Sequence, residues 1–140
     1  MIKKTITYVD YNGEERKEDY FFNLTKAEVM EMQLSKAESF SEYLRNIVDS
    51  KDVPAIAETF KKIILKSYGE RSIDGRMFRK IAVDGHKLAD DFAQTEAFSE
   101  LYTELATDEV KAEEFIRGVL PKDINGSSKT DFAKNVVAKS

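Results

Sequence analysis

Polar and apolar residues alternate over the first 23 residues of the chain, as they do in a β-hairpin. The segment "KKTITYVDY" is rich in β-branched and aromatic residues, and "EERKEDYFF" returns after Asn12-Gly13. An Asn-Gly pair suits a type I′ turn, because both central residues of that turn need a positive φ. We therefore predict an N-terminal hairpin over residues 1–23, whose aromatic end (Tyr20, Phe21 and Phe22) reaches the core.

From Thr25 the apolar period lengthens to three or four residues, which indicates helices. Thr25 and Glu28 have the spacing of a capping box at the start of a short helix. Asp52 precedes the strongest helical pattern in the chain, which has a proline in its first turn and Gly69 as its predicted stop. The predicted buried positions of this helix are Val53, Ile56, Ala57, Phe60, Ile63, Ile64 and Ser67.

Other helical stripes lie on either side of this long helix. Residues 39–50 carry one, and residues 87–94, 96–106 and 108–118 carry three more, the last with Thr107 as its predicted cap. The apolar positions of these four stripes are Phe40, Tyr43, Leu44, Ile47, Val48, Leu88, Phe92, Phe98, Leu101, Tyr102, Leu105, Val110, Phe115, Ile116 and Val119.

The turn signal of Asn12-Gly13 recurs at Asp74-Gly75, between the two groups of helices. We predict a second, short β-hairpin over residues 71–79. The glycines of this region do not have the spacing of a P-loop or of a dinucleotide-binding fingerprint, so a phosphate-binding loop is not favoured.

These patterns predict an α+β fold that is mainly α-helical. A single globular domain is expected over residues 1–121, with a hairpin at 1–23, helices at 25–69, a short hairpin at 71–79 and helices at 87–118. A Gly-Ser-Ser break marks residues 122–140, which we expect to form a flexible tail. The candidate protein-binding residues of the tail are Phe132, Val136 and Val137.

Composition removes several kinds of chemistry. The 140 residues include no cysteine and one histidine, His86, so disulfides, thiolate catalysis and zinc-thiolate sites are excluded. No nucleophile motif accompanies His86. Glu96, Glu100 and Glu104 share a helical face, but no other helix supplies a matching carboxylate and histidine set. We expect no enzymatic activity, no cofactor and no metal. A membrane span is also not expected, because no apolar run approaches about 18 residues.

Charge is distributed unevenly along a chain whose net charge is −4. Residues 61–80 hold seven basic and two acidic residues, whereas residues 90–114 hold one basic and nine acidic residues. These segments could face each other within one chain, form solvated faces, or make a salt-sensitive contact in a weak homo-oligomer. A nucleic-acid-binding module that uses the basic 61–80 segment is the alternative, which the acidic total disfavours. The candidate protein-binding residues here are Arg71, Arg76, Arg79, Lys80, Glu100 and Glu104.

Three runs of sequence resemble the tail assembly chaperones of long-tailed bacteriophages and prophages, especially those of Gram-positive hosts. They are "FFNLTKAEVMEMQLS", "YLRNIVDSKDVPAIAETFKKIILKSYGERSIDGRMFRK" and "FAQTEAFSELYTELATDEVKAEEFIRGVLPKD". Together they cover most of residues 21–123. The order of helix, Asp-Gly hairpin, acidic helix and terminal Val-Leu-Pro carries the resemblance.

This resemblance implies a non-enzymatic chaperone of phage tail morphogenesis. Its implied partners are the tape measure protein, the tail tube protein and a frameshifted longer form of the chain itself. The implied location is the cytoplasm of the host bacterium, and the protein is expected to be absent from the mature virion.

Overall fold

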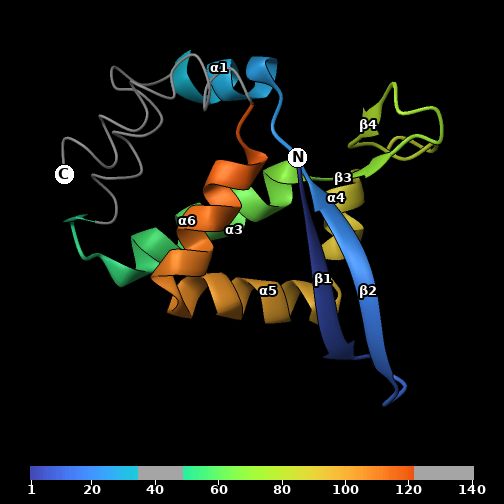
Figure 1. Cartoon of the computed structure of the whole chain (residues 1–140), viewed down its shortest axis with the longest axis horizontal. Coiled ribbons are helices and arrows are strands. Elements are labelled where there is room, and N and C mark those ends of the chain that lie inside the picture. Colours follow the sequence, from blue (N-terminus) through green and yellow to red (C-terminus); the bar gives the residue numbers. More distant parts are fainter. Residues whose placement is uncertain (35–48, 122–140) are drawn as a thin grey trace.

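The α+β class predicted from the sequence is confirmed by a computed structural model, which describes residues 1–34 and 49–121 (Figure 1). The predicted helix at 39–50 lies mostly outside these residues, and the predicted tail at 122–140 lies outside them entirely. The described strands are β1 (Ile2–Val9), β2 (Glu15–Phe22), β3 (Tyr68–Arg71) and β4 (Phe78–Arg79). The described helices are α1 (Lys26–Leu34), α3 (Val53–Ser67), α4 (Leu88–Phe92), α5 (Glu96–Thr107) and α6 (Glu109–Val119).

Both predicted hairpins form, and they join into one antiparallel sheet with the strand order β1-β2-β3-β4. The long hairpin pairs Ile2 with Phe22 at one end and Val9 with Glu15 at the other. The end of β2 then pairs with the start of β3, where Phe22 lies opposite Tyr68. The second hairpin is therefore an extension of the first, although about 45 residues separate β2 from β3 in the sequence.

The turn at Asn12-Gly13 is not of type I′. Only Gly13 of this pair has a positive φ, at 83°, and its N–H donates to the carbonyl of Asp10 over 2.9 Å. The Asp10 carboxylate also accepts the backbone N–H groups of Asn12 and Glu14, at 2.9 and 3.0 Å. A type I turn followed by one left-handed glycine is the common three-residue hairpin loop, and it uses the same sequence signal.

The sequence predicted a capping residue for three of the described helices, and two of these predictions are confirmed. Thr25 and Glu28 form the reciprocal capping box, with distances of 2.8 and 3.1 Å between each side chain and the other's N–H. Asp52 caps α3 by accepting the Ala55 N–H at 3.2 Å. The predicted cap at Thr107 is wrong, because Thr107 ends α5. The neighbouring Asp108 caps α6 instead, because its carboxylate accepts the backbone N–H groups of Val110 and Lys111 in the first turn.

Gly69 does not stop α3 as a left-handed residue, as the sequence pattern predicted. The helix ends at Ser67, and Gly69 lies buried within β3. A Cβ atom at this position would lie 2.6 Å from the carbonyl oxygen of Arg79 and 2.6 Å from the ring of Phe78. The absence of a side chain is therefore what lets β4 approach β3.

The core lies between the inner face of the sheet and the helices α3, α5 and α6. Its centre is aromatic: Phe22 packs edge-on against Phe115, and the rings of Tyr68 and Phe92 stack with centroids 4.4 Å apart. Phe21 is only half-buried. The fully buried large side chains are Phe22, Leu24, Val29, Ile63, Ile64, Phe92, Leu101, Leu105, Phe115 and Val119.

Two residues that the helical pattern assigned to buried faces are exposed instead. Val53 is 71% exposed and Val110 is 65% exposed. Each lies in the first turn of its helix, where no element among the described residues buries the apolar stripe. Val110 is therefore an exposed apolar side chain among the exposed carboxylates of Glu109, Glu113 and Glu114.

Candidate protein-binding surface

An arm of the structure, which we define as residues 70–87, projects from the body beside the sheet (Figure 1). It contains the end of β3, all of β4 and a second turn closed by a bridge between Ile81 and Lys87. Gly75 and Gly85 give both turns a left-handed residue, with φ of 76° and 95°. The sequence analysis predicted the first of these turns, at Asp74-Gly75, and made no prediction for the second.

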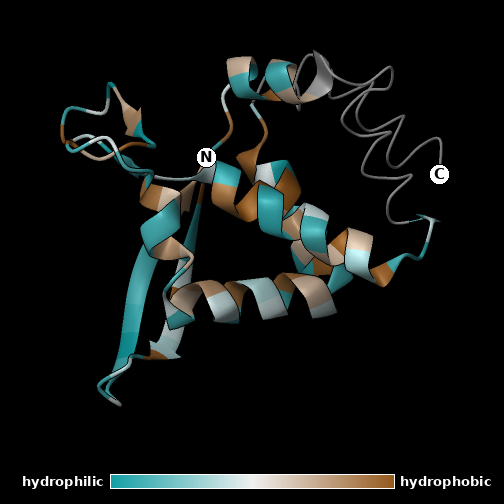
Figure 2. Ribbon diagram, turned by 180° about the vertical axis from the view of Figure 1, so that it is seen from behind, coloured by the Kyte–Doolittle hydropathy of each residue, from teal (hydrophilic) through white to brown (hydrophobic). Residues whose placement is uncertain are grey.

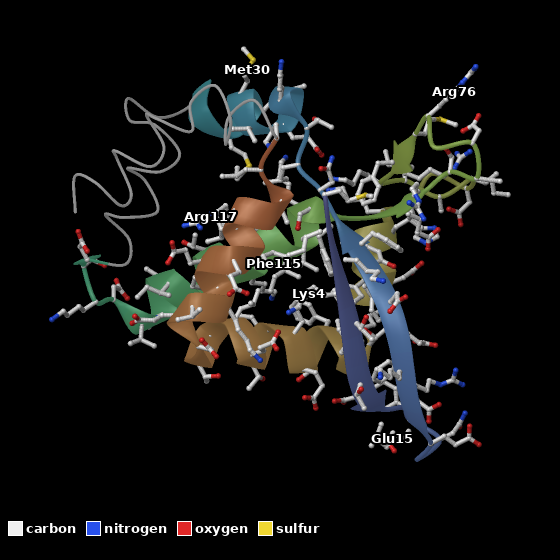
Figure 3. The ribbon with its side chains drawn as sticks, viewed as in Figure 1. Lys4, Glu15, Met30, Arg76, Phe115 and Arg117 are labelled. Carbon is white, nitrogen blue, oxygen red and sulfur yellow. The ribbon has the colours of Figure 1, made fainter. Side chains whose placement is uncertain are left out.

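The predicted basic residues of the arm face solvent. Arg71, Arg76 and Arg79 are all exposed. The guanidinium of Arg71 lies 5.0 Å from the centre of the Phe21 ring, a cation–π contact on the outer face of the sheet. Arg76 follows the turn and points away from the body (Figure 3). These three positive charges are therefore placed where a partner can reach them.

The arm also exposes apolar side chains, which the sequence analysis did not single out. Ile73 and Val83 are fully exposed, and Met77 and Ile81 are half exposed or more. In Figure 2 the ribbon of the arm carries both hydrophobic and hydrophilic colours along its length. A gathering of exposed apolar residues rimmed by charge is typical of a protein-binding surface.

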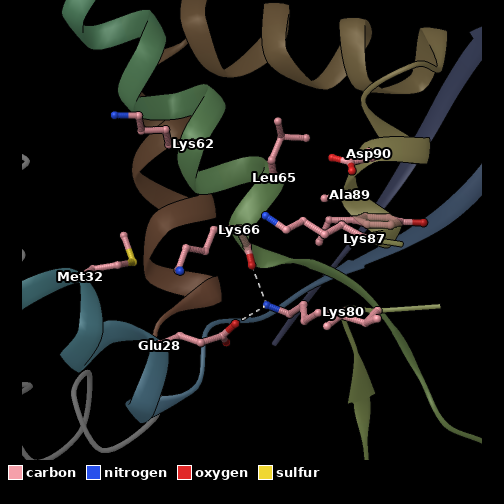
Figure 4. A pocket seen from close by; sticks show the side chains of 11 residues that line it. Glu28, Met32, Lys62, Leu65, Lys66, Lys80, Lys87, Ala89 and Asp90 are labelled. Atoms are coloured by element: carbon pink, nitrogen blue, oxygen red, sulfur yellow. Dashed lines mark hydrogen bonds and ion pairs between the residues drawn. The ribbon is translucent and has the colours of Figure 1, made fainter. Parts of the chain in front are cut away.

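Lys80 points inward and anchors the arm. Its ammonium donates to the carboxylate of Glu28 at 2.8 Å and to the carbonyl oxygen of Lys66 at 2.6 Å (Figure 4). It also donates to the carbonyl oxygen of Asn23 at 3.1 Å. Burial raises the pKa of Glu28, but the Lys80 ammonium and the N–H of Thr25 outweigh it, so this pKa lies below its usual value. Lys80 thus joins β4 to the start of α1 and the end of α3.

A groove of about 590 Å³ lies beside this anchor, between α1, α3, α4 and the arm (Figure 4). We call it the lysine groove. Its apolar floor consists of Met32, Leu65, Tyr68, Ile81 and Ala89. Its polar rim consists of Glu28, Lys62, Lys66, Lys80, Lys87 and Asp90. An apolar floor with a charged rim is suited to hold the side chains of another polypeptide.

The acidic segment lies elsewhere. In Figure 1 the arm projects at the upper right while α5 runs along the bottom, so the acidic residues of α5 lie away from the arm. The two oppositely charged segments meet only in part, at the lysine groove, where Asp90 lies near Lys62 and Lys66. Glu104 already has two internal partners, Lys4 at 3.0 Å and Lys111 at 3.1 Å. Burial raises the pKa of Glu104, yet these two ammonium groups lower it overall. Glu100, one turn earlier, is exposed.

His86 helps to fix the second turn of the arm. One ring nitrogen contacts the carboxylate of Asp84, and the other lies 2.7 Å from the carboxylate of Asp91 on α4. Hydrogen bonds to Asp91 and then Asp84 raise the pKa of His86 to about 9. This histidine therefore carries a positive charge at neutral pH and links the arm to α4.

Three other predictions concern the tail residues, metal sites and membrane spans. The tail residues Phe132, Val136 and Val137 lie outside the described residues. Within residues 1–34 and 49–121, no group of three or more acidic or histidine side chains could hold a metal ion. No helix in that part of the chain is long and apolar enough to cross a membrane.

Sequence reasoning found the charges of this surface but missed the groove. Nine of the eleven lining residues lie between positions 62 and 90, and the other two, Glu28 and Met32, come from α1. The groove exists only where these elements pack together, so no local pattern marks it. One signal was present: the turn Asp84-Gly85 matches Asp74-Gly75 and indicated a second exposed turn next to the first.

These features define a small α+β domain with a candidate protein-binding surface. The chain belongs to a family of phage tail assembly chaperones: a family model with the description "Phage tail assembly chaperone" matches residues 1–139. This match confirms the resemblance noted in the sequence. No curated protein and no solved structure matches the chain.

Proposed function

We propose that this protein is a non-enzymatic chaperone that binds the tape measure protein and helps to recruit tail tube subunits during tail assembly. The observation that carries the proposal is the match to a tail assembly chaperone family over nearly the whole chain. The proposal places the protein in the host cytoplasm and outside the finished virion. The proposed partners also include a frameshifted longer form of the chain itself.

The arm is the surface that best fits a client polypeptide. It combines four exposed apolar side chains with three exposed arginines, so it can cover apolar residues of a client and pair with its acidic residues. Methionine adapts to differently shaped apolar surfaces because its side chain is unbranched and flexible, and Met77 lies at the end of the turn. A long client with many similar segments requires such an adaptable surface.

The test is co-expression with the tape measure protein of the same phage. The arm variant carries Ile73→Ser and Met77→Ser, and both positions are exposed, so the fold should be kept. Each apolar anchor of an interface contributes about 1 kcal/mol or more. The variant should therefore bind roughly tenfold or more weakly and leave most of the client in the insoluble fraction.

The matched control carries Val9→Ser and Val53→Ser, two exposed valines that lie outside the arm. The control should keep the client soluble as wild type does. An arm variant that keeps the client soluble would place the client site elsewhere on the protein. A wild-type protein that neither binds nor solubilises the tape measure protein would refute the proposed function itself.

A further inference from the structure

We propose that the lysine groove selects which segments of the client this protein holds: it accepts segments whose apolar side chains are flanked by carboxylates, and it rejects basic ones. This selectivity rests on the proposed function, because it requires that a client polypeptide reaches the arm. It adds the chemistry of the bound segment, which neither the family match nor the exposed surface of the arm specifies.

The groove is continuous with the arm. Lys80, Ile81 and Lys87 belong to the arm and also line the groove. Ile81 is 57% exposed, so it joins the exposed apolar side chains of the arm to the apolar floor of the groove. A client segment that is held by the arm therefore lies next to the groove and can extend into it.

The groove has unmatched positive charge. Four lysines and two carboxylates line it, and one of these carboxylates, that of Glu28, is paired with Lys80. The other three lysines form no ion pair with any residue in the described part of the chain; they are Lys62, Lys66 and Lys87 (Figure 4). Asp90 adds one negative charge to the rim, so the groove keeps a net positive charge.

Apolar floor and charged rim have different effects on a bound segment. Exposed ion pairs are individually weak, so carboxylates alone would bind poorly, and apolar side chains that cover the floor must supply most of the affinity. The charges then discriminate, since a basic segment would bring like charges against three unmatched ammonium groups. Residues three and four apart share one face of a helix, so a single amphipathic helix can present apolar side chains and carboxylates together.

Charge decides against the chain's own tail as the occupant. Residues 122–140 contain four lysines and two aspartates, so their net charge has the same sign as that of the groove. A second copy of the chain fits the floor less well than a longer amphipathic segment. Val110, for example, is one exposed valine among carboxylates, whereas five apolar residues form the floor. A separate acidic and apolar polypeptide is therefore the favoured occupant.

The experiment measures binding of synthetic peptides that together tile the tape measure protein of the same phage. Each labelled peptide is titrated with the full-length chaperone at low salt, and fluorescence anisotropy gives its Kd. Peptides with apolar residues three or four apart and flanking aspartates or glutamates should bind. Versions with lysine at every acidic position should bind roughly tenfold or more weakly. The preference should fade as salt is added, because salt screens exposed charges.

Three full-length variants locate the selectivity. Lys66→Glu with Lys87→Glu reverses two charges of the groove, so it should weaken the acidic peptides roughly tenfold or more and strengthen their lysine versions. Ile81→Ser removes apolar surface from the floor and should weaken the acidic peptides without this reversal. Lys17→Glu with Lys61→Glu is the matched control, because both lysines are exposed and neither lines the groove. The substituted positions are all exposed, so urea unfolding should match wild type.

Three outcomes would overturn the inference: no tape measure peptide binds, acidic peptides and their lysine versions bind equally, or the groove variant keeps the preference of wild type. Sedimentation velocity tests the remaining occupant. If acidic peptides only dissociate copies of the chaperone from one another, the groove holds a second copy and the inference is wrong. The co-expression assay separates these failures from failure of the proposed function. If the groove variant solubilises the full-length client as wild type does, the chaperone function stands without selection by the groove.

Discussion

Removing the ammonium of Lys80 is the most direct test of how the arm is held to the body. We consider Lys80→Met, which keeps an unbranched side chain of similar length and deletes the charge. The substitution removes three hydrogen bonds, to the carboxylate of Glu28 and to the carbonyl oxygens of Asn23 and Lys66. It also leaves the Glu28 carboxylate partly buried without its cation.

The expected magnitude follows from the exposure of the two charged groups. Surface ion pairs contribute about 0–1 kcal/mol, whereas removing one partner of a fully buried pair costs about 3–5 kcal/mol. The side chains of Glu28 and Lys80 are 21% and 25% exposed, which places this pair between the two limits. We therefore expect Lys80→Met to lower the free energy of unfolding by about 2–3 kcal/mol.

Urea unfolding with an unchanged m-value is the appropriate assay. Lys66→Met is the matched control: Lys66 contributes only its backbone carbonyl to this network, so the change should stay within about 0.5 kcal/mol of wild type. Glu28→Gln combined with Lys80→Met completes a double-mutant cycle, because glutamine preserves the capping box. If Lys80→Met were as stable as wild type, the ammonium would not be held by these three oxygens in solution, and the reasoning would be refuted.

Two further predictions concern the same region. In urea unfolding, Gly69→Ala should destabilise the protein by about 1–3 kcal/mol, since its Cβ would lie 2.6 Å from the Arg79 carbonyl oxygen. Gly75→Asn should cost less, about 1 kcal/mol at most, because Gly75 has open space around it and a φ of 76°. Equal costs for the two variants would contradict this prediction. His86 should titrate by NMR near pH 9, and Asp91→Asn should lower that value. Because its folded pKa is raised above 6.5, its contribution to stability is complete below about pH 6.5 and is lost as the pH rises through about 9; a titration near 6.5 would show that neither carboxylate holds the ring.

Local signals allowed much of the fold to be predicted. The capping box of Thr25 and Glu28, the cap at Asp52 and the Asp74-Gly75 turn each depend on residues within four positions of one another. Such local contacts do not depend on the tertiary packing of the rest of the chain, so they can be predicted from a single sequence.

The errors came from contacts between distant segments. Gly69 follows a helix, which is the position of a helix stop, yet its role is to admit β4. Val110 continues a helical stripe, but it is 65% exposed, and no element among the described residues buries it. Asn12-Gly13 suits two kinds of turn, and the choice between them depends on how the strands pair. None of these three outcomes can be predicted from a short stretch of sequence alone.

The candidate site divides in the same way. The sequence located the basic and acidic segments, since charge is visible in composition. It could not show that Lys80 and Glu104 are used within the fold while Arg71, Arg76 and Arg79 remain exposed, because that difference depends on which side chains the folded chain brings together.

The exposed tip of the arm has a consequence for how this protein can change over evolution. Residues 73–77 are all exposed, so substitutions there remove no buried contact and, except at the turn residues Asp74 and Gly75, carry little cost to folding. Gly69 and Lys80, at the base of the arm, have no such freedom. We expect related chaperones that serve different phages to keep the residues at the base of the arm and to differ at its tip. The residues at 73–77 should then vary with the client that each chaperone binds, whereas the base is constrained by folding.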